Sequence, residues 1–243
     1  MRSSRRCLVT AVALVAVSGV AGCQPKTVVP STDRAAGPAA GSAAAVLAKL
    51  AVKPDGSMST YNRLKNFGAA WTDAQNATGG HNHCDTRDDI LDRDLTAVKR
   101  SGKCTVISGS LKDPYTGRTI KFKRGRATSS AVQIDHLVPL GNAWVTGASK
   151  LPLAERKELA NDPLNLLAAD GPANMGKSDD DASEWLPAQK SFDCEYVKRQ
   201  IAVKSKYHLW VTAKEKAAMQ AVLDHCGNQT LSSESSHEVK LKS

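Results

Sequence analysis

The sequence predicts an α+β fold, in which helices and a β-hairpin form one mixed domain over about residues 46–226 of the 243-residue chain. Residues 86–98 place their apolar side chains on one face of a helix, with acidic residues elsewhere. The sequence Asp-Pro-Tyr-Thr-Gly at 113–117 has strong turn chemistry and separates two segments with strand composition. Two long helical segments end the domain at 188–206 and 213–226. A domain of this length can bury a core of its own.

The remaining elements are predicted from local signals. Gly171-Pro172 opens a short helix, and Thr212 with Glu215 forms a capping box at the start of the last helix. In chain order, the expected helices are 61–71, 86–98, 153–160, a short helix from 171, 188–206 and 213–226, and the expected strands are 104–111, 118–122, 129–135 and 164–168.

The N-terminus has the features of an export signal. Three arginines precede an apolar run at 8–17, which is too short to span a membrane as a helix. The run leads to Val-Ala-Gly-Cys at 20–23, which resembles a bacterial lipobox in which Cys23 is lipidated. The alternative is a plain signal peptide with a chance cysteine. We therefore expect 1–22 to be a lipoprotein signal peptide and the protein to be extracytoplasmic, either lipid-anchored at the cell membrane or secreted.

Two polar segments flank the predicted domain. Residues 23–45 are rich in Ala, Gly, Pro, Ser and Thr and are expected to form a disordered tether, and 227–243 a flexible tail. The chain has 33 Lys and Arg against 24 Asp and Glu, a net charge of +9, from which loss of the signal removes three arginines. The remaining basic excess favours a polyanionic partner but does not identify one.

Four cysteines remain beyond the signal and the lipobox: Cys84, Cys104, Cys194 and Cys226. An even number in an oxidising compartment predicts two disulfides. Of the three possible pairings we favour Cys84–Cys104 and Cys194–Cys226, because each closes a local loop within one half of the domain. A tetrahedral zinc site is the competing use, but the sequence lacks Cys-x-x-Cys spacing.

Three short segments together carry the groups that metal-dependent phosphodiester cleavage requires. They are Asp-His-Leu-Val-Pro at 135–139, Asp-Pro-Leu-Asn-Leu at 162–166 and Asn-Met-Gly-Lys-Ser-Asp at 174–179. Hydrolysis needs a base that deprotonates water, and positive charge that neutralises the phosphorane and the leaving oxygen.

Asp135 and Asn174 offer hard oxygen ligands that suit a partly hydrated Mg²⁺ or Mn²⁺. His136 has an unperturbed pKa near ~6.5 and can act as the general base at neutral pH. Adjacent residues on a strand point to opposite faces, so Asp135 and His136 can share a site only if the strand ends there.

Two further residues are assigned from their positions. Lys177 lies three residues after Asn174, so both are expected on one helix face, where Lys177 would meet the substrate phosphate. Asn165 is expected to bond to backbone groups of the loop that bears His136, and so to position that residue rather than react.

At these segments the chain resembles the HNH endonucleases with the ββα-metal fold, whose pattern is Asp-His-(Leu/Ile)-Val-Pro, then Asn-Leu, then Asn-x-x-Lys-(Ser/Gly)-Asp. Over about 60–226 it is also similar to the actinobacterial secreted HNH proteins of the DUF1524, GmrSD C-terminal-like group. The segments that carry this similarity are 84–91, 113–117, 129–136 and 185–187. The resemblance implies a ββα-metal finger within the domain, a divalent metal on Asp135 and Asn174, His136 as general base, and nucleic acid as substrate, with DNA favoured. The chain departs from the pattern at Met175, where many relatives carry a cation.

Two neighbouring features have two readings each. Lys123, Arg124 and Arg126 form either a nucleic-acid-binding patch or an ordinary solvated strand edge. The acidic run at 179–181 either extends the metal site or complements a helix dipole. The literal His-Asn-His at 81–83 is interpreted as a loop, since the family name describes dispersed residues.

Two functional hypotheses follow. The first is an exported, metal-dependent endonuclease. The second is a non-catalytic surface lipoprotein that uses the same fold as a binding module, and hydrolysis of another phosphoester is a further alternative. The intact set of Asp135, His136, Asn165, Asn174 and Lys177 favours the endonuclease. No protein partner is implied, and the pattern is compatible with DNA or RNA.

Overall fold

The computed structural model describes residues 41–74, 76–228 and 230–239. Within these ranges no helix is long and apolar enough to cross a membrane. The helices are α1 (Ala43–Lys49), α2 (Arg63–Phe67), α3 (Thr86–Asp94), α4 (Leu140–Val145), α5 (Leu153–Asn161), α6 (Gly171–Lys177), α7 (Asp193–Lys206) and α8 (Ala213–Leu223). The strands are β1 (Thr96–Ser101), β2 (Thr105–Lys112), β3 (Thr119–Lys123), β4 (Val132–His136) and β5 (Leu166–Asp170). Short 3₁₀ turns are η1 (Ser129–Ala131), η2 (Ala148–Lys150), η3 (Lys190–Phe192) and η4 (Glu234–His237). Helices mixed with two small antiparallel sheets confirm the α+β class.

The first sheet has the strand order β1-β2-β3 and contains the predicted hairpin. Its turn closes as the residues at 113–117 predict: the carboxylate of Asp113 accepts from the backbone N of Thr116 at 2.7 Å, and Gly117 adopts φ +74°. Gly109 lets β2 approach the end of α3 closely, because a Cβ there would lie 2.6 Å from Cδ2 of Leu95.

The prediction of a helix over 86–98 is wrong after Asp94. Leu95 is extended, and the chain continues as β1, which pairs with β2. Leu95 and Val98 fit a helical spacing, but β-branched Thr96 and Val98 also suit a strand. Pairing with β2 selects the strand over the helix, and the local sequence pattern carries no information about this pairing.

The second sheet joins β4 to β5 in antiparallel register, with His136 opposite Leu166. α6 follows β5 directly, so these three elements form a ββα unit. Asp170 caps α6 by accepting from the backbone N of Ala173 at 2.9 Å. β4 begins at Val132, after the turn η1, and ends at His136. The strand therefore ends at Asp135 and His136, which is the condition for these two residues to share a site.

The connection from β4 to β5 contains α5, which was predicted, and α4, which was not. Arg199 of α7 binds the end of this connection. Its guanidinium is buried and donates to the carbonyl oxygens of Pro163, Leu164 and Leu166 at 2.8–3.0 Å. These bonds satisfy backbone acceptors at the entry to β5 and fix its position relative to α7.

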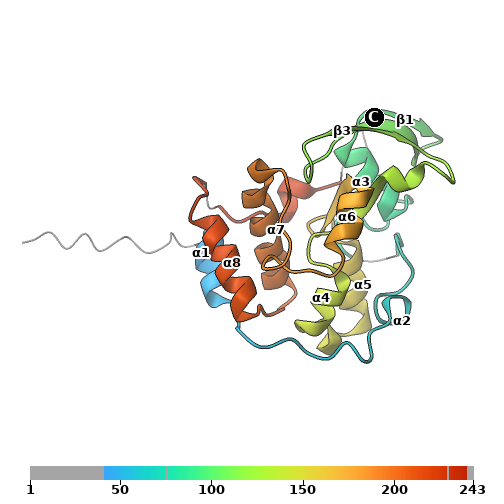
Figure 1. Cartoon of the computed structure of the whole chain (residues 1–243). Coiled ribbons are helices and arrows are strands. Elements are labelled where there is room, and N and C mark those ends of the chain that lie inside the picture. Colours follow the sequence, from blue (N-terminus) through green and yellow to red (C-terminus); the bar gives the residue numbers. More distant parts are fainter. Residues whose placement is uncertain (1–40, 75, 229, 240–243) are drawn as a thin grey trace, which may run out of the picture. The chain divides into compact units, whose positions relative to one another are not determined.

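Three apolar clusters form the core. One lies among α1, α7 and α8, where Leu47 and Met219 are fully buried, and Figure 1 shows α1 (blue) beside α8 (red-orange). The second surrounds α4 and α5 and includes Phe67 of α2. The third packs α3 against both sheets through residues such as Ile90 and Leu166, and Figure 1 shows α3 next to the three-stranded sheet.

The folded part extends beyond the predicted limits of 46 and 226. Ser42 caps α1, and Ala43 is fully buried, so the last residues of the expected tether (23–45) belong to the core. The expected flexible tail (227–243) is packed at 230–239: Ser232 bonds to Glu195 at 3.0 Å, and Arg93 donates to the carbonyl oxygen of His237 at 3.2 Å. The signal peptide 1–22 and Cys23 lie outside the described residues.

Two expected helices are shorter than predicted. The helix expected at 61–71 is confined to α2, because Gly68 follows it with φ +79° and breaks the helical path. The helix expected at 188–206 begins at Asp193, after the 3₁₀ turn η3. The capping box of Thr212 and Glu215 at the start of α8 is confirmed, although α8 ends at Leu223.

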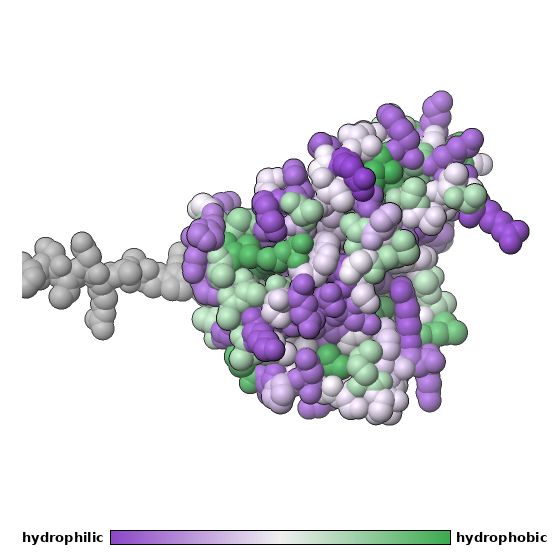
Figure 2. Space-filling view, viewed as in Figure 1, coloured by the Kyte–Doolittle hydropathy of each residue, from purple (hydrophilic) through white to green (hydrophobic). Residues whose placement is uncertain are grey.

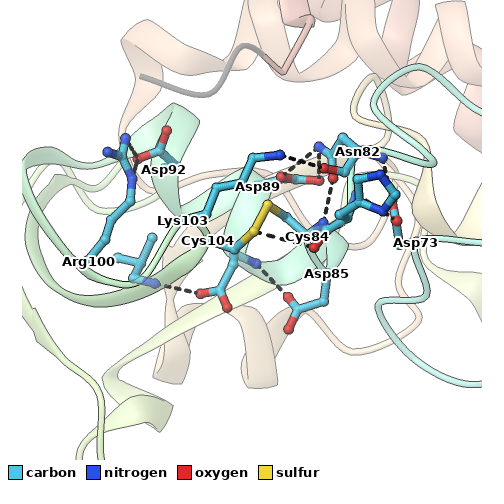
Figure 3. The surroundings of a disulfide bond; sticks show 12 residues. Asp73, Asn82, Cys84, Asp85, Asp89, Asp92, Arg100, Lys103 and Cys104 are labelled. Carbon is cyan, nitrogen blue, oxygen red and sulfur yellow. Dashed lines mark hydrogen bonds and ion pairs between the residues drawn. A yellow bond between two sulfur atoms is a disulfide. The ribbon is translucent and has the colours of Figure 1, made fainter. Parts of the chain in front are cut away.

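Both favoured disulfides are present, with Cα atoms 5.4 Å apart for Cys84–Cys104 and 5.8 Å apart for Cys194–Cys226. The first joins the loop before α3 to the start of β2. Figure 3 shows its surroundings, where Asn82 donates to both carboxylate oxygens of Asp89 at 3.0 Å. The second joins α7 to the residues after α8.

Candidate active site

A cavity of about 330 Å³ opens where β4 ends beside α6. Asp135 and His136 from β4 and Asn174 from α6 line it. Tyr61 and Arg63, at the entry to α2, line it as well. Three of the residues predicted for catalysis and metal binding therefore share one cavity, although about forty residues separate the first two from the third.

The imidazole of His136 is held from two directions. Its Nε2 lies 2.9 Å from the carbonyl oxygen of Ala160. Because a carbonyl oxygen can only accept, Nε2 carries the proton and Nδ1 keeps its lone pair. The indole of Trp71 stacks on the ring, with centroids 5.6 Å apart and planes inclined by 14°.

The protein also keeps His136 uncharged. Burial, and then the charges of Arg63 and Lys177, lower its pKa to about 3, against the opposing effect of the bond to Ala160. At neutral pH the ring is therefore a neutral proton acceptor at Nδ1.

The carboxylate of Asp135 is buried and bound by two donors. The hydroxyl of Tyr115 donates to Oδ2, and Nζ of Lys177 lies 3.0 Å from each carboxylate oxygen. Burial, and then the charge of Asp135, raise the pKa of Tyr115 well above its ordinary range, so the phenol remains a donor. Asp135 and His136 contact different neighbours, as expected for adjacent strand residues, yet both reach the cavity.

The structure places Lys177 inside the protein. Its side chain is 0% exposed, and Nζ donates to Asp135 and to the carbonyl oxygen of His136 at 2.8 Å. Asn174, three residues earlier, is partly exposed. A substrate phosphate therefore cannot reach Lys177 as expected, because β4 covers the ammonium group and accepts its hydrogen bonds.

Asn174 keeps an oxygen available for a cation. Its Nδ2 donates to Gln133 at 2.8 Å, which orients the amide, and no donor to its Oδ1 is found among the described residues. With Asp135 this gives two oxygen ligands, a set that fits Mg²⁺ or Mn²⁺ retaining much of its water. Within the described part of the chain, no group of three or more His, Cys, Asp or Glu side chains is arranged to hold a metal ion. The donors fit a lightly coordinated ion and not a closed cage.

Asn165 lies where the sequence indicates, bonded to the loop after His136. Its Oδ1 accepts from the backbone N of Val138 at 2.8 Å, and its Nδ2 donates to the carbonyl oxygens of Val138 and Leu159 at 3.3 and 3.4 Å. The side chain is fully buried. These bonds tie the loop to the segment that enters β5.

The three basic residues predicted to bind nucleic acid have different surroundings. Arg124 donates from Nε to the carbonyl oxygen of Val106 at 2.7 Å and pairs with Asp88 of α3, so it is committed to the fold. Lys123 and Arg126 are exposed.

Lys123 belongs to a larger group of lysines on the outward face of the first sheet. Residues directly opposite in an antiparallel pair share a face. By the register, Lys99 and Lys123 flank Ser108, while Lys121 lies opposite Ser110 and Lys112 opposite Thr119. We call Lys99, Lys112, Lys121 and Lys123 the lysine face. Hydrophilic side chains project from the region of β1 and β3 in the space-filling view (Figure 2).

Sequence reasoning missed three residues at the site. Tyr115 stands within a predicted turn, and its position there gives no sign that its hydroxyl reaches β4. The fold brings Trp71 onto the ring of His136 and Arg63 to the cavity, and neither residue carries a local sequence signal. The literal His-Asn-His at 81–83 is a loop, as the sequence indicates.

The structure is thus an α+β domain with a ββα unit whose first strand ends in Asp-His beside a cavity. The family model of the C-terminal domain of GmrSD restriction endonucleases matches residues 85–222. The chain belongs to this family, also called DUF1524. An "Uncharacterized secreted protein" of Arthroderma benhamiae is 37% identical over 191 residues, which cover 78% of this chain and 87% of that protein. No solved structure matches the chain.

Proposed function

We propose that this protein is an exported, metal-dependent endonuclease that hydrolyses phosphodiester bonds of nucleic acid, with DNA as the favoured substrate. The observation that carries the proposal is the position of His136: it lines one cavity with Asp135 and Asn174, and its Nε2 is bound to the carbonyl oxygen of Ala160. With Nε2 bound to a carbonyl oxygen, Nδ1 is the ring nitrogen left to accept a proton, and the residue lies on a cavity beside a carboxylate, as a general base must. Membership of an endonuclease family supports the same reaction.

In this proposal Nδ1 of His136 takes the proton from the attacking water. Asp135 and Asn174 would hold the divalent ion, which when bound would neutralise charge on the phosphate and the leaving oxygen. Lys177 and Tyr115 fix the Asp135 carboxylate through the bonds described above, and Asn165 fixes the loop after His136. Lys177 is thus a positioning residue here, instead of the phosphate contact expected from spacing.

The lysine face supplies the contact with the nucleic-acid backbone. Ammonium groups on a sheet surface neutralise phosphates without reading sequence, which suits an enzyme with little sequence preference. Lys123 contributes directly, and Arg126 extends the basic surface, whereas Arg124 acts by holding β3 to α3.

Export is supported by the relative's name and by the two disulfides, which form in oxidising compartments. We further propose lipidation at Cys23, which would tether the domain to the outer side of the cell membrane.

A non-catalytic binding module is the second candidate. The observation that favours it is that both oxygens of Asp135 already have donors, which weakens this carboxylate as a metal ligand. Under this reading the lysine face would bind nucleic acid without cleavage.

The test uses the exported protein purified with both disulfides formed. It is incubated with supercoiled plasmid, single-stranded DNA, RNA and a chromogenic phosphodiester, each in Mg²⁺, Mn²⁺ or EDTA. Metal-dependent cleavage of a nucleic acid supports the endonuclease. Binding without cleavage favours the binding module, and cleavage of the small ester alone indicates another phosphoesterase.

A further inference from the structure

Phosphodiester hydrolysis gains from a fixed cation at the scissile phosphate, and Lys177 is enclosed against Asp135. A different cation lines the cavity, namely Arg63. We propose that Arg63 is a catalytic residue that binds the scissile phosphate, a role which rests on the endonuclease function proposed above. Arg63 precedes the residues 85–222 that match the family model, so the match itself assigns it no role.

Arg63 lies close to the imidazole. It lines the cavity with His136 and also borders a small void that Trp71, His136 and Ala160 share. Its charge also lowers the pKa of His136, second only to burial. A group bound by Arg63 would thus lie near the imidazole of His136.

The backbone that carries Arg63 is firmly anchored. Asn62 caps α2 by accepting from the backbone N of Lys65 at 2.9 Å. The carbonyl oxygen of Asn66 accepts from Arg156 of α5 at 2.7 Å, and Phe67 packs in the second apolar cluster. α2 lies beside α5 in Figure 1. An anchored helix start holds the arginine at the cavity without ordering a flexible loop.

The guanidinium of Arg63 is free to bind an anion. It is exposed, and no carboxylate lies within ion-pair distance of it among the described residues. By contrast, Arg93, Arg100 and Arg124 are paired with aspartates. An arginine presents parallel N–H donors that match two phosphate oxygens and keeps its charge at all physiological pH values. These donors would stabilise the negative charge that grows on the phosphoryl oxygens.

The test compares Arg63→Ala, Arg63→Lys and native protein in metal-dependent plasmid cleavage. Lys65→Ala is the matched control, because it removes an exposed cation from the same helix at a position outside the cavity. We expect Arg63→Ala to lower kcat by about 100-fold, in line with removal of one transition-state donor. Arg63→Lys should recover part of this loss, and Lys65→Ala should match the native protein. A kcat for Arg63→Ala within threefold of native overturns the proposal.

A second measurement separates this proposal from the endonuclease function. Binding of a fluorescent DNA duplex in EDTA is measured by anisotropy for the same proteins. If the native protein cleaves none of the substrates, the proposed endonuclease function is wrong, and the proposed phosphate contact of Arg63 is tested by binding alone. If Arg63→Ala then binds DNA more weakly than Lys65→Ala, the result supports Arg63 as a phosphate contact. Equal binding by the two variants overturns the proposal for Arg63.

Discussion

The indole of Trp71 stacks on the imidazole of His136, with ring centroids 5.6 Å apart and planes inclined by 14°. Trp71 adopts φ +61°, a left-handed conformation that costs free energy in a bulky residue. Its carbonyl oxygen accepts from the backbone N of Thr86 at 3.2 Å, at the start of α3. The stack and the bond from Nε2 to Ala160 together leave the imidazole little freedom to rotate.

Replacing Trp71 should therefore disturb catalysis more than folding. For Trp71→Ala we expect kcat to fall by about 10- to 100-fold with little change in KM, because the base is misplaced while the substrate-binding groups remain. Trp71→Phe retains a stacking face and should recover most of the rate. The measurement is steady-state cleavage, with circular dichroism as the folding control. Equal kcat values for the alanine variant and the native protein would contradict this role.

Removing the Lys177 ammonium should destabilise the fold strongly. Lys177→Met leaves Asp135 with a buried, uncompensated charge, which costs about 3–5 kcal/mol of unfolding free energy. Lys190→Met is the control: Lys190 is 72% exposed and pairs with Asp193 at 3.5 Å, so its loss should cost at most about 1 kcal/mol. Urea unfolding of both variants measures the difference. Similar midpoints for the two would show that the buried pair contributes little.

The lysine face should control the salt dependence of nucleic-acid binding. Changing Lys99, Lys121 and Lys123 to Gln should lower the slope of log Kd against log salt by about 0.9 for each phosphate that the protein no longer neutralises. The control changes three exposed lysines on other elements, Lys49, Lys65 and Lys214. A slope that falls equally in both variants would indicate general charge attraction and no defined surface.

The packed segment 230–239 should make stability depend on acid pH. Burial by itself raises the pKa of Glu195, but hydrogen bonds from His237 and Ser232 and the charge of Lys198 outweigh it and lower the pKa to about 2. Between the ordinary value of 4.5 and about 2, the unfolded chain then binds more protons than the folded one. The stabilisation from Glu195 is thus complete above pH 4.5 and is lost as the pH falls toward 2.

Thermal unfolding of the native protein and Glu195→Gln between pH 2 and 7 measures this effect. The difference in Tm should be largest near neutral pH and shrink below pH 4.5. Glu184→Gln, at an exposed position, is the control and should show no such trend. A Tm difference for Glu195→Gln that stays constant across the range would refute the assignment.

The parts of the fold that local signals determine were predictable from the sequence. The turn at 113–117, the capping box at Thr212 and the strand that ends at His136 each depend on a few adjacent residues. β1 was not predictable, because Leu95 and Val98 fit both a helix and a strand, and only the partner β2 selects the strand. The folded part extends past the expected limits at 45 and 227, because Ala43 of the alanine-rich segment is buried and the serine-rich segment bonds to Glu195 and Arg93.

In the candidate site too, local sequence signals indicated some residues, and tertiary contacts alone placed the others. Asp135, His136, Asn165 and Asn174 were proposed from their residue types and order, and the structure gathers them around one strand end. Spacing correctly related Lys177 to a helix, but it could not show that β4 covers that side of the helix. Trp71 and Arg63 reach His136 from more than sixty residues away, which no local pattern reveals.

The central claim is that His136 is the general base of a nuclease. Plasmid nicking by His136→Ala and native protein in Mn²⁺ tests it most directly, with Lys65→Ala as a control for surface change. The account predicts that the native and control proteins nick the plasmid in a metal-dependent way. It also predicts that His136→Ala remains folded by circular dichroism and loses the activity. Nicking by His136→Ala at the native rate would contradict the account.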